Sequence, residues 1–158
     1  MKRSAAKILI AKNTGFCKGV KRAVQITERT LAENPGRNVY SLGPVIHNSE
    51  AMRKLSGLGL KVAKLVAGIP EGSVLILPSH GTPESVITVA AGKRLKLVDV
   101  TCPHVASVKR ICRDLCARGR KVVIIGEAEH AEIKALKDSA PGCIIIENEE
   151  QVPEGLFT

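Results

Sequence analysis

The chain has 158 residues, 44% of them apolar and 25% charged, which is the composition of an ordinary globular protein with a hydrophobic core. Its 24 Lys and Arg outnumber its 15 Asp and Glu, and the net charge of +9 attracts anions such as phosphorylated metabolites or acidic proteins. The aromatic residues are only Phe16, Tyr40 and Phe157. Proteins that bind single-stranded nucleic acids stack the bases on aromatic rings, so this composition argues against a nucleic-acid partner.

The cysteines and the apolar runs indicate a cytoplasmic protein that does not contact a membrane. The five cysteines are an odd number without the dense, regular spacing of a secreted disulfide scaffold. The apolar run from Ile8 to Ala11 is too short for a secretory signal or a membrane span. We therefore expect a reducing environment in which the thiols stay free.

Short apolar runs alternate with helical patterns along the chain. Strands are predicted at residues 7–11, 38–42, 61–63, 73–77, 95–100, 121–125 and 143–146. Helices are predicted at 20–31, from residue 49 onward, at 83–91, at 103–119 and up to residue 139. This order predicts an α/β fold of parallel βαβ units with right-handed crossovers, either as one sheet of about seven strands or as two lobes divided near Cys102.

Loops that follow the predicted strands carry nucleophilic, basic or acidic side chains. In chain order these residues are Cys17, His47, His80, Cys102, His130 and Glu132. The carboxyl ends of parallel strands share one edge of a sheet, where helix N-termini also converge, so these side chains can meet in one cleft. His104 lies in the first turn of the helix after Cys102 and is expected on the surface.

The remaining cysteines are expected to pack rather than to react. Cys112 and Cys116 lie one turn apart on a helix whose apolar spacing also includes Val108, Ile111 and Leu115, and no second cysteine pair is nearby. Cys143 lies near the start of its strand. A buried thiol behaving as a small hydrophobe is also the simplest interpretation of any single cysteine, Cys102 included.

Cys17 and Cys102, taken with the histidines, leave two chemical interpretations open. A Cys–His hydrolase dyad needs one residue of each kind and leaves the other loops without a role. Thiolates suit iron–sulfur clusters, and imidazoles beside backbone N–H groups suit an anion such as a diphosphate, so a cluster beside an anion site is more economical. A cluster needs at least a third thiolate, and no other cysteine is evidently placed to supply it.

Five motifs, in this order and spacing, resemble those of the 4-hydroxy-3-methylbut-2-enyl diphosphate reductases, iron–sulfur enzymes that complete the methylerythritol phosphate (non-mevalonate) pathway to isoprenoids. They are NTGFCKGV at 13–20, VIHN at 45–48, SHG at 79–81, DVTCP at 99–103 and EHAE at 129–132. The resemblance runs from about residue 7 to residue 152. It implies that Cys17 and Cys102 are two of the three cysteines that bind a [4Fe-4S] cluster. It also implies that His47, His80 and His130 line the substrate pocket and hold the diphosphate.

The resemblance further implies the reaction and its partners. The substrate, 4-hydroxy-3-methylbut-2-enyl diphosphate, is reductively dehydroxylated to isopentenyl and dimethylallyl diphosphate, with Glu132 as the source of protons. The electrons come from ferredoxin or flavodoxin, both acidic, which fits the basic charge of this chain. The loop of the fifth motif, residues 126–132, departs from the family in having Glu127 where histidine is common and Ala131 where proline is common.

Members of this family are about twice as long as this chain and fold into three similar α/β lobes around the cluster. By that comparison residues 1–100 form the first lobe, residues 101–158 form part of the second, and the third lobe and third cysteine ligand are absent. The favoured hypothesis is the N-terminal portion of a reductase, inactive without the missing portion or a complementing chain. The alternative is a non-catalytic α/β remnant that binds anions.

Overall fold

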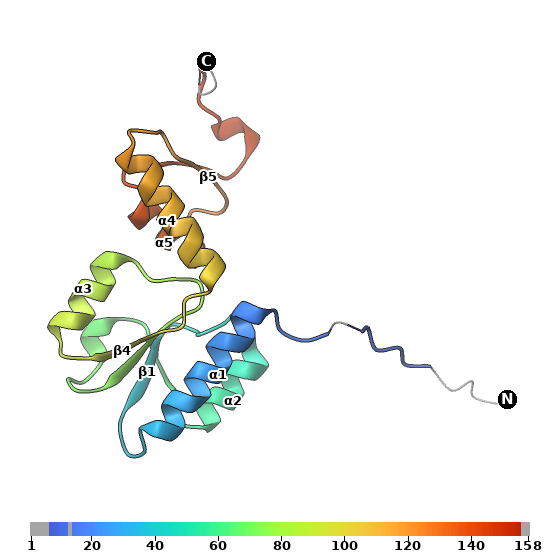
Figure 1. The fold of residues 1–158 in the computed structure, drawn as a ribbon, viewed down its shortest axis with the longest axis vertical. Helices are drawn as coiled ribbons and strands as arrows, with labels where there is room; N and C mark the ends of the chain where they lie inside the picture. The colour runs from blue at the N-terminus through green and yellow to red at the C-terminus, as the bar shows by residue number, and fades with distance from the viewer. Residues whose placement is uncertain (1–6, 13, 156–158) are drawn as a thin grey trace.

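The structure, a computed structural model, describes residues 7–12 and 14–155, and the strands among them form two parallel β-sheets (Figure 1). Asn13 of the first motif, together with Phe157 and Thr158, lies outside the described residues. Within the described part, no helix is long and apolar enough to cross a membrane.

The elements follow the predicted alternation closely. The helices are α1 (Lys18–Glu33), α2 (Ser49–Gly57), α3 (Glu84–Gly92), α4 (Pro103–Ala117) and α5 (Ala131–Ser139). The strands are β1 (Val39–Leu42), β2 (Lys61–Ala63), β3 (Val74–Leu77), β4 (Lys96–Asp99), β5 (Val123–Ile125) and β6 (Ile144–Ile146). Two short 3₁₀ helices, η1 (Val66–Gly68) and η2 (Glu149–Gln151), complete the order.

All strand pairs are parallel, which confirms the predicted α/β class. The first sheet has the order β2-β1-β3-β4, with Val39 opposite Val74 in the β1–β3 pair. Among the described residues, the second sheet contains β5 and β6 alone. We call α1–α3 with β1–β4 the four-stranded unit, and α4, α5, β5 and β6 the two-stranded unit. Of the two arrangements that the sequence allowed, the structure therefore has two sheets rather than one.

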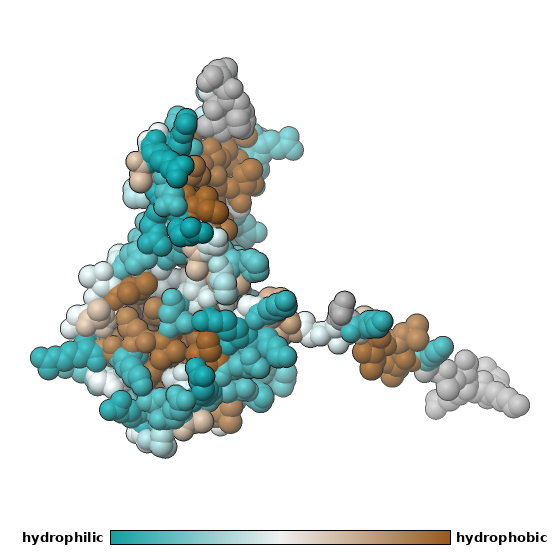
Figure 2. Space-filling model, in the orientation of Figure 1, coloured by the Kyte–Doolittle hydropathy of each residue, from teal (hydrophilic) through white to brown (hydrophobic). Residues whose placement is uncertain are grey.

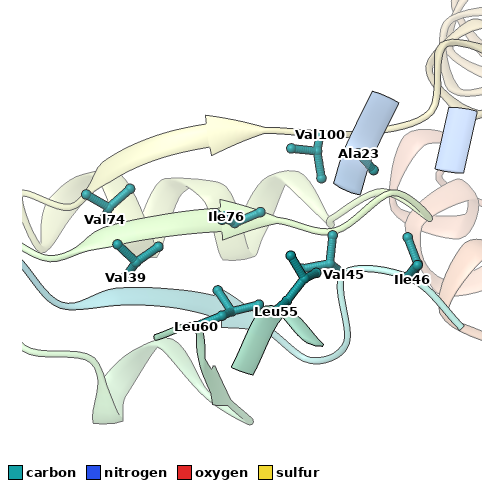
Figure 3. Packing of buried hydrophobic residues seen from close by; sticks show 9 residues of the cluster. All are labelled: Ala23, Val39, Val45, Ile46, Leu55, Leu60, Val74, Ile76 and Val100. Atoms are coloured by element: carbon teal, nitrogen blue, oxygen red, sulfur yellow. The ribbon is translucent and has the colours of Figure 1, made fainter. Parts of the chain in front are cut away.

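The core of the four-stranded unit lies on both faces of its sheet, because the central strand β3 is buried along its whole length. On one face, Ala23 of α1 and Leu55 of α2 pack against strand residues that include Val74 and Ile76 (Figure 3). On the other face, Ala90 of α3 packs with η1 and the alternate strand residues. Each aliphatic side chain buried in this way contributes about 1.5–3 kcal/mol to folding.

The strand predicted at residues 7–11 is wrong. These residues, all within the described part, pair with neither sheet, and Figure 1 shows that residues 7–12 run away from the body of the molecule. Ile8, Leu9 and Ile10 are consequently 86%, 79% and 83% exposed. The physical reason is that an apolar run shows only a tendency to extend, whereas a strand also needs a sheet edge that bonds its N–H and C=O groups.

The apolar face expected on the helix after Cys102 is only partly buried. Cys112 is buried, but Val108, Ile111 and Leu115 are exposed on α4, and the two-stranded unit shows apolar surface in Figure 2. A sheet of two strands covers only a narrow strip of a helix. The rest of the apolar stripe on α4 therefore faces outward.

Candidate functional site

A cleft of about 470 Å³ opens where the loops after β1, β3 and β4 meet the start of α5. All six predicted site residues line it: Cys17, His47, His80, Cys102, His130 and Glu132. Five further residues line it that were not singled out from the sequence: Phe16, Val20, Ile46, Asn48 and Ser79. Each of these five belongs to one of the five sequence motifs, which is the signal that could have identified them.

Backbone hydrogen bonds hold the loops of the four-stranded unit side by side at this cleft. The amide N–H of Ser79 donates to the carbonyl oxygen of Val45 at 3.0 Å, and the N–H of Cys102 donates to the carbonyl of Ser79 at 2.8 Å. These bonds continue the parallel pairing of β1, β3 and β4 beyond the strand ends. The sheet order therefore makes His47, His80 and Cys102 neighbours.

Three imidazoles from both units meet in the cleft. The His47 ring centroid lies 5.0 Å from that of His80 and 5.5 Å from that of His130. The Nδ1 atom of His130, at the start of α5, accepts a hydrogen bond from the N–H of Glu132 at 3.3 Å. A neutral imidazole that accepts at Nδ1 carries its proton on Nε2, so His130 can donate a hydrogen bond to a ligand.

His80 is the buried member of this cluster, with 8% of its surface exposed. Burial, followed by the charges of His47 and His130, lowers the pKa of His80 to about 4. Its Nδ1 atom is buried and has no hydrogen-bond partner among the described residues. A bound anion would both reduce the repulsion among the imidazoles and bond a protonated His80, so this cluster suits an anion.

We expect the free energy of unfolding to fall as the pH is lowered from about 6.5 to about 4. In this window His80 binds a proton in the unfolded chain but not in the folded one, so the unfolded state binds more protons and is favoured. A loss of about 1–3 kcal/mol is expected, smaller than the full shift in pKa implies because solvent reaches the cleft. Urea denaturation at several pH values measures it.

The His80→Gln variant is the control for this titration, because carboxylates also titrate at low pH in both proteins. The difference in unfolding free energy between the two proteins should change between pH 6.5 and pH 4. A constant difference would show that His80 keeps an ordinary pKa in the fold.

The two predicted ligand cysteines stand at the N-termini of two helices. Cys17 is the N-cap of α1 and Cys102 the N-cap of α4, where the helix dipole favours negative charge. A Cβ atom on Gly19 would lie 2.5 Å from the Sγ of Cys102 and 4.0 Å from the Sγ of Cys17, so both thiols flank this glycine. Arg22 of α1 donates from Nη1 to the carbonyl of Thr101 at 3.3 Å, which ties α1 to the Cys102 loop.

The other cysteines pack in the two-stranded unit, as expected. Cys112 is buried with Val122 and Ile124, and Cys116 and Cys143 pack against the same cluster. Burial raises the pKa of both Cys112 and Cys143, which keeps them as neutral thiols. Among the described residues, no three His, Cys, Asp or Glu side chains are grouped so that they could hold a metal ion. The cleft itself is lined by two cysteine side chains, Cys17 and Cys102.

Comparison with known proteins gives a consistent result. The family model described as LytB protein matches residues 8–156. The chain is 37% identical over 146 residues to the 4-hydroxy-3-methylbut-2-enyl diphosphate reductase of Clostridioides difficile, covering 92% of this chain and 52% of that protein. It is also 37% identical over 153 residues to the enzyme of the same name from Aquifex aeolicus, covering 94% and 52%.

Solved structures agree with the sequence relatives. The E-1-hydroxy-2-methyl-but-2-enyl-4-diphosphate reductase of Plasmodium falciparum superimposes with a TM-score of 0.87 at 29% identity, over 93% of this chain and 46% of that one. A structure of (E)-4-hydroxy-3-methyl-but-2-enyl diphosphate reductase, the terminal enzyme of the non-mevalonate pathway, superimposes with a TM-score of 0.80 at 36% identity, over 93% and 53%. The chain thus spans about half the length of the proteins it matches.

Proposed function

Because the chain belongs to the LytB protein family, we propose that it is the N-terminal part of a 4-hydroxy-3-methylbut-2-enyl diphosphate reductase, active only with the portion it does not span. The observation that supports this most is the convergence of two thiols, three imidazoles and a carboxylate on one cleft. The exposed apolar segment at Ile8–Ile10 and the apolar stripe of α4 are surfaces that a further portion would cover. In this proposal residues 1–100 form the first lobe and residues 101–158 part of the second, and the division of the strands between two sheets supports that boundary.

Cys17 and Cys102 would hold two of the irons of a [4Fe-4S] cluster, and the portion that the chain does not span would supply the third thiolate. The cluster supplies single electrons and a Lewis-acidic iron for the loss of the substrate hydroxyl group. All five cysteines of the chain are free, which suits the reducing cytoplasm where we place the reaction.

The imidazole cluster binds the diphosphate in this proposal. His130 donates from Nε2, and His47 lies between the other two rings, within reach of the same anion. His80 takes up a proton when the anion enters, because the negative charge offsets the burial that lowers its pKa in the empty cleft. The three histidines thus orient the substrate by its charged end.

Glu132 acts as the proton donor. It lies in the first turn of α5, lines the cleft and is only partly exposed. The reaction takes two electrons and two protons, breaks the C–O bond of the hydroxyl group and releases water. A carboxyl group beside the diphosphate site can deliver a proton to the substrate end that is being reduced. The electrons come from an acidic ferredoxin or flavodoxin, attracted by the net charge of +9.

A chimera tests the proposal, with the second half of the Aquifex aeolicus relative joined after residue 155. After anaerobic loading with iron and sulfide, we expect a stable cluster by EPR and reduction of the substrate with a viologen as electron donor. The 158-residue chain alone should give neither, because two thiolates do not hold a four-iron cluster.

The second candidate is the anion-binding remnant, which is favoured by the presence of only two thiols among the described residues that line the cleft. If the remnant interpretation is correct, the chimera should bind inorganic pyrophosphate but acquire neither a cluster nor reductase activity. A stable cluster and reductase activity in the 158 residues alone would contradict both candidates.

A further inference from the structure

The segment Gly81–Glu84 directly follows His80 and is held by several residues of the two-stranded unit, of which three sets of contacts carry the argument. The first is made by Lys109 of α4, whose side chain is only 8% exposed. Its Nζ donates to the carbonyl oxygen of Thr82 at 2.8 Å and lies 3.5 Å from the Oε1 of Glu84. A buried ammonium group is unfavourable unless it is bonded in this way, so the position of Lys109 depends on these contacts.

The second is made by Asp138, near the end of α5. Its Oδ2 accepts a hydrogen bond from the backbone N–H of Glu84, the first residue of α3, at 2.6 Å. The N-cap residue of α3, Pro83, makes no side-chain cap of its own. Asp138 therefore caps α3 from the other unit, a contact usually made by a neighbour in the chain and worth about 1 kcal/mol.

The third contact is a close approach of backbone to side chains at Gly81. This residue has a φ of +89°, and a Cβ atom there would lie 3.3 Å from the Cβ of Ala135 and 3.3 Å from the Cγ1 of Val105. Ala135 of α5 is fully buried. Both α4 and α5 thus lie directly on the segment that follows His80, so closely that a Cβ atom at Gly81 would be in tight contact with each of them.

These contacts attach the end and the middle of α5 to the segment Gly81–Glu84, while the start of α5 lies at the histidine cluster. The helix has nine residues and is about 13 Å long. Near its end Asp138 is bonded to Glu84, in its middle Ala135 lies on Gly81, and at its start His130 stands 5.5 Å from His47. A rotation of α5 about its Asp138 end would move His130 the most.

We propose that Lys109 and Asp138 are positioning residues, which hold α4 and α5 on the segment Gly81–Glu84 and thereby set the distance between His130 and His47. The claim that the distance between His130 and His47 serves to bind a diphosphate rests on the proposed function. The claim that Lys109 and Asp138 orient the two units does not depend on it. Neither residue lines the histidine cleft.

Solution NMR of the full chain tests the orientation directly. Residual dipolar couplings are measured in a neutral stretched gel for the wild type, Lys109→Met, Asp138→Ala and Asp138→Asn. The Met variant keeps the apolar stem of Lys109, and the Asn variant keeps an oxygen that accepts from Glu84 N–H. Lys54→Met is the control, since Lys54 pairs with Glu28 inside the four-stranded unit.

We expect one alignment tensor to fit both units in the wild type, Lys54→Met and Asp138→Asn. Lys109→Met and Asp138→Ala should need two different tensors while each unit keeps its internal couplings. The Glu84 amide should also exchange at least tenfold faster in Asp138→Ala. A single tensor in both Lys109→Met and Asp138→Ala would overturn the proposal; if Lys109→Met fails to fold, the exposed Asp138 still decides it.

Binding of inorganic pyrophosphate, followed by calorimetry, tests the link to the histidines. We expect the dissociation constant to rise about tenfold or more in Lys109→Met and Asp138→Ala and to return to near the wild-type value in Asp138→Asn. Unchanged binding in variants that need two tensors would show that the contacts orient the units but not the histidines, against the proposal. Absence of binding in the wild type would count against the proposed function, while the couplings would still decide the positioning role.

Discussion

We expect replacement of Cys17 or Cys102 by Ser to abolish assembly of the proposed iron–sulfur cluster in the chimera. Each change removes one of the two thiols that flank Gly19, and a serine hydroxyl is a harder and much less acidic ligand than a thiol. A site left with too few thiolates does not retain a four-iron cluster. Iron and acid-labile sulfide per chain, together with the EPR signal of the reduced protein, measure the loss.

The matched control for these variants is Cys116→Ser, a cysteine of the same chain that packs against the core of the two-stranded unit. It should leave the cluster content unchanged and affect stability only slightly. Full cluster content in both Cys17→Ser and Cys102→Ser would contradict the proposal that these two cysteines are cluster ligands.

Gly19→Ala is expected to separate cluster binding from folding. The added Cβ would lie 2.5 Å from the Sγ of Cys102, so this sulfur must turn away from its present position. The fold tolerates the change, because a single rotation of the Cys102 side chain relieves the contact and Ala is favoured over Gly in a helix by about 1 kcal/mol. We therefore expect unchanged or slightly higher stability in urea together with a loss of most of the cluster content.

Gly92→Ala is the control, since Gly92 also lies in a helix and a Cβ there would meet nothing within 4 Å. It should keep the full cluster content. If Gly19→Ala also kept it, the position of the Cys102 sulfur beside Gly19 would not matter for the cluster.

The sequence was most informative about the loops that carry chemistry. Parallel strands end at a common edge, so the order of apolar runs and loops already predicted that His47, His80 and Cys102 lie close together. In the structure, backbone hydrogen bonds of Ser79 join the loops that carry these three residues. The expected strand at residues 7–11 failed because a strand depends on a partner that no local pattern reveals. The exposure of apolar residues on α4 was not predicted for a similar reason, since the width of the neighbouring sheet determines which helix residues are buried.

Other features of the site depend on contacts between residues distant in sequence. The burial of His80, and with it the lowered pKa, required loops and helices distant in sequence to pack around its side chain. The approach of both thiols to Gly19 required α1 to pack beside the start of α4. Neither the burial nor the packing leaves a periodic signal in the chain.

Local pattern therefore accounts for the alternation of strands and helices, for the parallel class and for the loop in which each reactive side chain stands, because propensities and strand ends act over a few residues. The tertiary structure alone decided that the strands form two sheets and that His130 reaches His47 from the second of them. That meeting depends on α5 lying on Gly81 and on Asp138 capping α3, contacts between residues 54 positions apart that form only when the two units pack together.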